Sequence, residues 1–186
     1  MRIKRTLVVA ALVFVCVTAA PAAGVGVPPS IVGRWQTVRT CQGLVVDLQK
    51  AGLSTLAPGV VGDYFPNQTP QNLAKKKSLC QGAKPQIHAH FFTSHGKFGS
   101  IDQHGQQVDD GTYQANGSTL TISNPDFSGS FRFRIQGKTL MLTPLLTPEL
   151  EQQALADPLN FHTAGWMVAV AYNGHPWPRV ACAKWC

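Results

Sequence analysis

The sequence predicts one mostly β domain: a single antiparallel, up-and-down β-barrel of about eight strands with one or two short helices. From residue 87 onward, apolar and polar residues alternate with the period of two that is typical of half-buried strands. Pairs that tolerate positive φ, such as Asn116-Gly117, separate these segments at short intervals. Short strands joined by tight turns favour a barrel or a sandwich, and closure into a barrel removes the exposed edges.

The first 23 residues have the pattern of a secretory signal peptide. Three basic residues precede an uncharged run over 7–20, and a cluster of small residues at 20–23 follows. A membrane-spanning helix needs about 20 apolar residues, and this run is shorter. We therefore expect a secreted protein with no stable membrane insertion after cleavage, whose mature domain covers residues 24–186.

The charge of the mature chain does not favour a nucleic-acid partner. The chain has 16 Lys and Arg residues against 9 Asp and Glu residues, and the leader contains three of the basic ones. One basic run, Lys75-Lys76-Lys77, falls in a predicted loop without interleaved aromatic residues, which is typical of a solvated surface segment.

Four cysteines remain after the leader: Cys41, Cys80, Cys182 and Cys186. An even number of cysteines in a secreted chain indicates two disulfides, for which three connectivities are possible. Their spacing is not that of zinc-binding cysteine pairs. We favour Cys41–Cys80 with Cys182–Cys186, where the first bond closes the longer loop.

The N-terminal part of the mature domain combines one strand with a long excursion. Residues 31–39 alternate as a first strand. Residues 43–56 have apolar positions close to helical spacing. The segment 57–85 is rich in Pro, Gly, Asn, Gln and Lys, which predicts a long surface loop. A helix-and-loop excursion therefore covers about residues 41–86.

The remaining strands form a meander, which two further segments interrupt. Thr147 as N-cap and Pro148 at the first helical position predict a helix that ends near Asp157. The apolar run 165–172 then predicts a buried last strand. The other strands are expected at 87–93, 97–102, 112–114, 119–123, 131–136 and 140–142.

Gly33-Arg34-Trp35 lies on the first strand, just inside the predicted mature N-terminus. With the excursion, the hairpins and the late helix that follow, this motif resembles the calycin superfamily of lipocalins and their relatives. The stretch 91–113 is similar to uncharacterised secreted lipocalin-like proteins of actinobacteria. The resemblance implies that Trp35 closes one end of the barrel beside Gly33, and that Arg179, after the last strand, stacks over it. It also implies that the protein carries a small apolar molecule.

Aromatic residues are the candidates for a ligand-binding interior. An eight-stranded barrel is just wide enough to be filled by its side chains or to hold one small ligand, so a packed core and a cavity both remain open. The residues expected to line the interior are Phe92, Phe98, Tyr113, Phe131, Phe133 and Trp166.

His88 and His90 are candidates for chemistry because alternation along a strand places both imidazoles on one face. Two such histidines could begin a zinc or copper site, which still needs a third ligand. Short His pairs are weak motifs, so we expect them to line a wet face and expect no metal or other cofactor. Asp109 and Asp110 are expected to form a turn and not to converge as a catalytic pair, since adjacent strand residues point to opposite faces.

The sequence thus predicts a secreted, calycin-type protein that binds a small apolar molecule, and a binding protein rather than an enzyme. Two alternatives stay open. One is a secreted enzyme that uses the His88/His90 face, and the other is a cell-surface interaction module that uses the long loop before Cys80.

Overall fold

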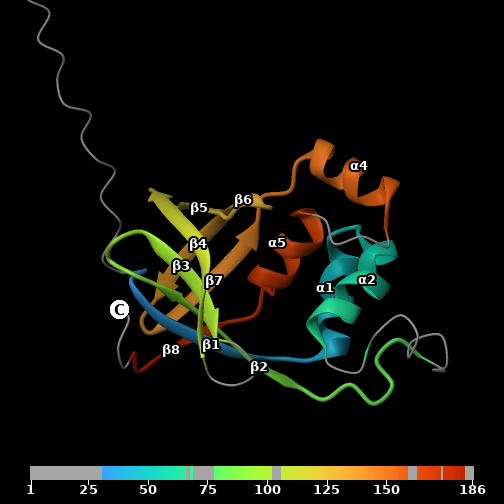
Figure 1. The fold of residues 1–186 in the computed structure, drawn as a ribbon, viewed down its shortest axis with the longest axis horizontal. Helices are drawn as coiled ribbons and strands as arrows, with labels where there is room; N and C mark the ends of the chain where they lie inside the picture. The colour runs from blue at the N-terminus through green and yellow to red at the C-terminus, as the bar shows by residue number, and fades with distance from the viewer. Residues whose placement is uncertain are drawn as a thin grey trace, which may run out of the picture.

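The computed structural model describes residues 31–65, 68, 78–101, 106–158, 163–172 and 174–182. The predicted signal peptide and Cys186 lie outside these described residues. Within them, eight antiparallel strands follow one another around a closed barrel in sequence order (Figure 1). The predicted fold class is therefore confirmed.

Each strand pairs with the next, and β1 pairs with β8 to close the barrel, with Trp35 opposite Arg179. The alternation predicted for residues 131–136 is present, because Phe131 and Phe133 are buried while Arg132 and Arg134 are exposed. The strands are β1 (Gly33–Arg39), β2 (Gln86–Phe92), β3 (Lys97–Ile101), β4 (Gln107–Asn116), β5 (Thr119–Ser123), β6 (Ser128–Gln136), β7 (Thr139–Pro144) and β8 (Trp177–Val180).

Two helices begin at a threonine whose side chain caps the first turn. The Thr40 side chain accepts a hydrogen bond from the backbone N–H of Gly43 at 3.0 Å, and the Thr147 side chain accepts one from the backbone N–H of Leu150 at 3.3 Å. The predicted helix after Thr147 is confirmed. The helices are α1 (Cys41–Lys50), the short 3₁₀ helix η1 (Ser54–Leu56), α2 (Ala57–Tyr64), α4 (Pro148–Ala156) and α5 (Thr163–Ala171).

Two predicted elements differ from the structure. The segment 57–85 does not begin as a surface loop: its first eight residues form α2, in which Val60 and Val61 are buried. The predicted last strand at 165–172 is wrong, because these residues belong to α5. An uninterrupted apolar run is compatible with a buried strand or a buried helix, and every residue of α5 from Ala164 to Ala171 is buried.

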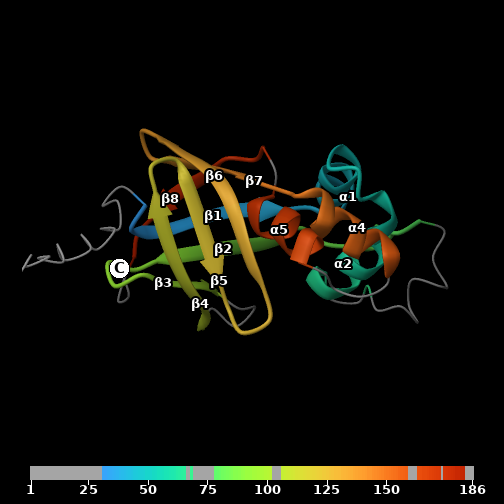
Figure 2. The same ribbon diagram turned by 90° about the horizontal axis from the view of Figure 1, so that it is seen from above.

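The two helical insertions lie at the same end of the barrel because of the topology. In a meander, successive connections alternate between the two ends. The β1–β2 connection contains α1, η1 and α2, and the β7–β8 connection contains α4 and α5, so both lie at what we call the open end. Tight turns join β2 to β3, β4 to β5 and β6 to β7 at the closed end. Figure 2 shows the helices gathered on one side of the barrel.

The closed end contains the contact that the resemblance implied. The Arg179 guanidinium carbon lies 4.6 Å from the centre of the Trp35 ring, and Arg179 Nη2 donates to the backbone oxygen of Val32 at 2.9 Å. Trp35 Nε1 donates to the backbone oxygen of Ile31 at 2.9 Å. Gly33 has a φ of 145°, which L side chains rarely adopt. One detail of the prediction is wrong: Arg179 lies within β8, not after the last strand.

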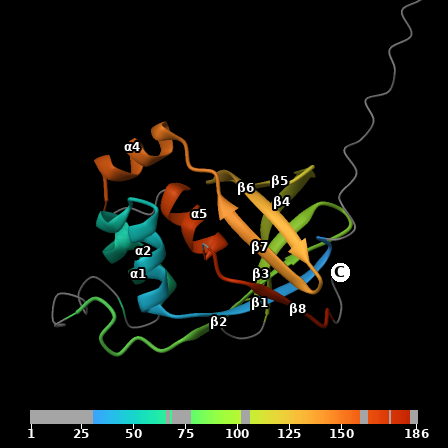
Figure 3. The same ribbon diagram turned by 180° about the vertical axis from the view of Figure 1, so that it is seen from behind.

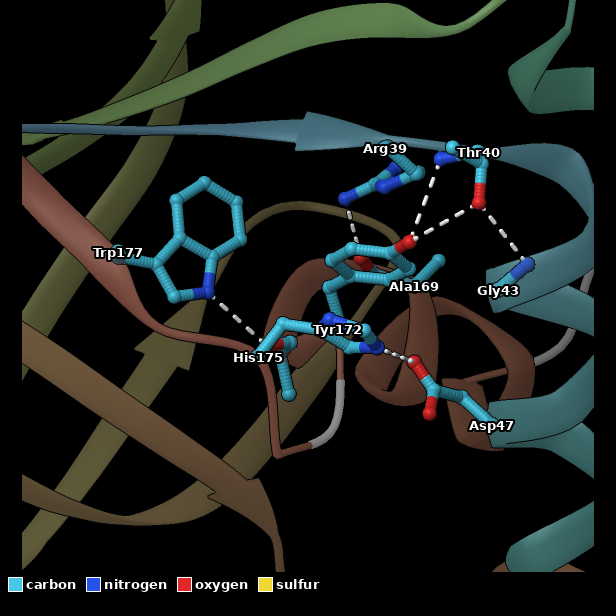
Figure 4. Close-up of polar contacts among 9 residues, drawn as sticks. Arg39, Thr40, Gly43, Asp47, Ala169, Tyr172, His175 and Trp177 are labelled. Carbon is cyan, nitrogen blue, oxygen red and sulfur yellow. Dashed lines mark hydrogen bonds and ion pairs between the residues drawn. The ribbon is translucent and has the colours of Figure 1, made fainter.

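Helix α5 lies between the barrel and helices α1 and α2 (Figure 3). It approaches the barrel wall closely because residue 129 of β6 is glycine: a Cβ there would lie 2.7 Å from Met167 Cγ. Its last carbonyl groups, which have no partner within the helix, accept hydrogen bonds from barrel side chains. Arg39 donates to Ala169, and Trp177 Nε1 donates to Ala171 at 3.0 Å (Figure 4).

A second set of contacts attaches α1 to the end of α5. The Tyr172 hydroxyl accepts a hydrogen bond from the backbone N–H of Thr40 at 3.2 Å. Asp47 of α1 is fully buried, and its carboxylate lies 3.6 Å from Nε2 of His175, whose ring stacks on Tyr172 at 3.9 Å (Figure 4). The helices and the barrel therefore share one core.

The Cys41–Cys80 disulfide is present, with 5.6 Å between the two Cα atoms. It ties the start of α1 to the segment that leads into β2. Cys182 is also disulfide-bonded. None of the helices that the structure describes has the length and apolar character needed to cross a bilayer.

Candidate functional site

A cavity of about 390 Å³ lies at the open end of the barrel. Strands β2, β3 and β4 form one wall, and α2, α5 and the β5–β6 connection form the rest. The wall is part aromatic and part polar. The lining residues are Tyr64, His88, His90, Phe98, Ser100, Asp109, Asp110, Asn124, Pro125, Asp126, Phe127, Trp166 and Val170.

The two histidines lie together on one face of β2, as predicted, and this face points into the barrel. Their ring centres are 4.6 Å apart, and both line the cavity. The His90 ring lies between Phe98, at 5.0 Å, and Trp177, at 4.8 Å. His90 is 2 % exposed, whereas His88 is partly exposed through the cavity.

Both imidazoles are held neutral. Burial, assisted by the positive charge of Arg39, lowers the pKa of His90 to about 3 and lowers the pKa of His88 well below its usual value of 6.5. His90 Nε2 lies 3.3 Å from the backbone oxygen of Val170. A carbonyl oxygen only accepts, so Nε2 carries the proton and Nδ1 has a free lone pair. Among the described residues, His90 Nδ1 and His88 Nε2 have no hydrogen-bond partner.

The expectation that Asp109 and Asp110 form a turn is wrong, since both lie within β4. The register shifts between Phe98 and Gly99, which pair with Gly111 and Asp109, so Asp110 is the extra residue of a β-bulge. A bulge breaks the strict alternation of faces and re-aims a side chain. Both carboxylates therefore line the cavity.

The two carboxylates have different environments. Asp109 is exposed and forms an ion pair with Lys97 at 3.3 Å. Asp110 is more buried, and burial raises its pKa, while a hydrogen bond from Ser100 lowers it in part. Ser100 is the cross-strand neighbour of His90, so the bulge brings a carboxylate beside the buried imidazole.

The sequence did not single out two residues of the site, Tyr64 and Arg39. Tyr64 lines the cavity and Arg39 lies over its ring, and we call this part of the site its deep end. Arg39 is 1 % exposed, and its guanidinium carbon lies 4.7 Å from the Tyr64 ring and 5.6 Å from the Tyr172 ring. Burial raises the pKa of Tyr64 to about 12, against the opposite influence of Arg39, so the Tyr64 hydroxyl stays protonated. Trp35, Thr37 and Arg39 are two residues apart along β1, so alternation of side chains would have placed Arg39 on the same inner face as Trp35. No signal pointed to Tyr64, which fell in a predicted loop.

The six predicted interior aromatics are all buried, but only Phe98 and Trp166 line the cavity. Trp166 reaches it from α5 and stacks on Phe127, with 5.7 Å between ring centres and 12° between ring planes. The other four pack in the core. Their contacts include Phe92 against Tyr113 at 5.0 Å, and Phe131 against Trp166 at 6.1 Å; Phe133 is 7 % exposed.

Within the part of the chain that the structure describes, no group of three or more His, Cys, Asp and Glu side chains is placed to hold a metal ion. The site is a partly polar cavity at the mouth of the barrel. Comparison of the chain with protein-family models, with curated proteins and with solved structures found no match.

Proposed function

We propose that the protein is a secreted carrier that binds one small molecule in the cavity at the open end of the barrel. The observation that carries this proposal is a cavity of about 390 Å³ whose wall combines aromatic rings with buried imidazole nitrogens that have no partner in the described part of the chain. Ligand sites are typically concave, largely apolar and provided with a few polar groups that orient the ligand. The fold and the Arg179–Trp35 contact agree with the calycin resemblance, which has the same implication.

The polar part of the wall changes the expected ligand. The sequence predicts a largely apolar molecule, but four of the six expected interior aromatics are packed in the core and leave polar groups on the cavity wall. A buried polar atom without a partner costs about 1–3 kcal/mol. A ligand that hydrogen-bonds these atoms removes that cost. The proposed ligand therefore has an aromatic or apolar body and at least one polar group.

The electrostatics favour binding over acid–base catalysis. A general base is most effective when its pKa lies near the working pH. The pKa of His90 is lowered to about 3 and that of His88 is lowered well below 6.5, so both are weak bases at neutral pH. They are suited to accept or donate hydrogen bonds as neutral rings. The interaction-module alternative depends on the loop before Cys80, of which residues 66, 67 and 69–77 lie outside the described residues.

The test is a ligand panel of fatty acids, sterols and substituted aromatic compounds, read by melting temperature and by Trp fluorescence. A ligand at a hundredfold excess over its dissociation constant stabilises the folded state by about 2.7 kcal/mol. Trp166 is on the cavity wall, so binding should also change its fluorescence.

Three variants separate binding from packing. Phe127→Ala removes an aromatic side chain that the β5–β6 connection contributes to the cavity wall. It should weaken ligand binding about tenfold or more. Phe133→Ala empties a core position outside the cavity, so it should lower the melting temperature and leave the affinity within about twofold. Arg132→Ala, on the outer face, should change neither. A panel without any binder, or affinity lost equally in Phe133→Ala and Phe127→Ala, would contradict the proposal.

A further inference from the structure

We infer that the ligand is an organic cation, such as a protonated amine attached to an aromatic body, and that its charged group lies on the Asp110 and Asp126 side of the cavity. The inference rests on the proposed function and names its ligand class.

The first support is the charge of the cavity wall. The chain as a whole is basic, with a formal net charge of +7. The described lining residues nevertheless include three carboxylates and no Lys or Arg. Lys97 pairs with Asp109, whereas neither Asp110 nor Asp126 forms an ion pair within the described residues. An acidic wall with two carboxylates that lack an ion pair within the described residues favours a positively charged ligand.

The second support is the state of the buried imidazoles. His90 is 2 % exposed and lines the cavity, and the bond to Val170 leaves its Nδ1 as an acceptor that has no hydrogen-bond partner among the described residues. An ammonium group has donors and no acceptor, so it complements both a carboxylate and a free imidazole lone pair. A carboxylate ligand complements neither.

The third support is the aromatic part of the wall. Phe127 and Trp166 stack almost parallel beside Asp126, and Phe98 lies against His90. The faces of aromatic rings attract cations, and they also bury an apolar ligand body. A wall that combines carboxylates with aromatic faces is therefore suited to a ligand that has both a positive charge and an apolar body.

Arg39 orients this ligand. Its guanidinium does not line the cavity, because it lies over the Tyr64 ring and donates to Ala169 at the C-terminal end of α5. Its charge still acts on His88 and His90, so a cation is disfavoured at that deep end. The Tyr64 hydroxyl, which stays protonated, can donate there to a neutral acceptor on the ligand.

The test compares three probes with the same 2,2-diphenylethyl body and different charge: 2,2-diphenylethylamine, 2,2-diphenylethanol and 3,3-diphenylpropionate. Binding to the full mature protein is measured by calorimetry at pH 7. The amine should bind at least about tenfold more tightly than the alcohol, since charged hydrogen bonds are the stronger ones. The carboxylate should bind more weakly than the alcohol.

Asp110→Asn keeps the size of the side chain and a partner for Ser100, and should reduce amine affinity about tenfold while leaving alcohol affinity within about twofold. Asp126→Asn changes an exposed residue, so folding is not at risk, and it should reduce the preference for the amine in the same direction. Asp157→Asn is the matched control, because it removes an exposed carboxylate that does not line the cavity. It should leave all three affinities unchanged.

Equal affinity for the three probes, or a higher affinity for the carboxylate, would contradict the inference that the ligand is a cation. Neither result would contradict the proposed carrier function. Failure of all three probes while neutral panel members bind would contradict the inference in the same way. Failure of the whole panel together with the probes would overturn the carrier function and this inference with it.

Discussion

His90 on β2 donates a hydrogen bond from Nε2 to the backbone oxygen of Val170 on α5, with 3.3 Å between the atoms. With Arg39 and Trp177, which donate to Ala169 and Ala171, it provides partners for three consecutive carbonyl groups at the end of a buried helix. These carbonyl groups have no partner in the helix itself and would be costly to bury unpaired. The barrel interior thus stabilises the helix that forms part of the cavity wall.

The first prediction concerns pH. The folded-state pKa of His90 is lowered from 6.5 to about 3, so between these values the unfolded chain binds more protons. The contribution of His90 to the free energy of unfolding is therefore fully present above about pH 6.5. Below that pH it decreases by about 1.4 kcal/mol per pH unit. His90→Gln keeps a donor for Val170 but does not titrate, so it should make urea unfolding less dependent on pH between 4 and 6.5. His95→Gln, in an exposed turn, is the control; an unchanged slope in His90→Gln would contradict the prediction.

The second prediction concerns the closed end. Arg179→Ala removes the cation over Trp35 and the donor to Val32. Because Arg179 is exposed, the two losses together should lower the free energy of unfolding by about 1–2 kcal/mol. Arg132→Ala, also exposed but without an aromatic contact of this kind, should stay within about 0.5 kcal/mol. Chemical denaturation followed by Trp fluorescence measures both, and equal effects would show that the Trp35 contact is not stabilising.

The third prediction concerns the Cys41–Cys80 disulfide, which closes a loop with a sequence separation of 39. Replacing both cysteines by serine should lower the free energy of unfolding by about 4 kcal/mol on the chain-entropy model. The comparison is made without reductant by urea unfolding. The same midpoint in the double variant and the wild type would show that helix packing alone holds this loop.

The fourth prediction concerns Gly43 in the first part of α1. Alanine is normally favoured over glycine in helices by up to about 1 kcal/mol. A Cβ at this position would lie 2.2 Å from the Tyr172 hydroxyl oxygen and 2.8 Å from Thr40 Oγ1. Gly43→Ala should therefore destabilise the protein by about 1–2 kcal/mol.

Adding Tyr172→Phe removes the hydroxyl and provides the control. The cost of Gly43→Ala should be smaller in that background, which a double-mutant cycle of unfolding free energies measures. Stabilisation by Gly43→Ala in the wild type would contradict the packing of Tyr172 against α1.

The barrel wall was predictable because its signals are local. Phe131 and Phe133 alternate with two arginines on β6, and Asn116-Gly117 marks the turn between β4 and β5. These patterns follow from the geometry of an extended backbone and of tight turns. Thr147 as N-cap is equally local, and its hydrogen bond is present.

The cavity was less predictable because its wall comes from segments far apart in the sequence. His88 and His90 on one face of β2 followed from alternation, but Asp110 reaches the cavity through a bulge that alternation does not describe. Tyr64 and Trp166 arrive on helices that were interpreted as loop and strand. The influence of Arg39 on the pKa of both histidines was not predictable either, because its charge acts from another strand.

The sequence by itself predicted the antiparallel barrel, because alternation along strands and tight turns are local signals. It favoured the pairing of Cys41 with Cys80 among three possible connectivities, and the contact of Arg179 with Trp35 was implied by the resemblance to the calycins. Only the tertiary structure decided that residues 165–172 are a buried helix, that Phe92, Tyr113, Phe131 and Phe133 pack the core, and that a partly acidic cavity remains at the open end. The physical reason is that an apolar run becomes helix or strand according to what surrounds it. Whether space is left inside a barrel likewise depends on how all the side chains pack together.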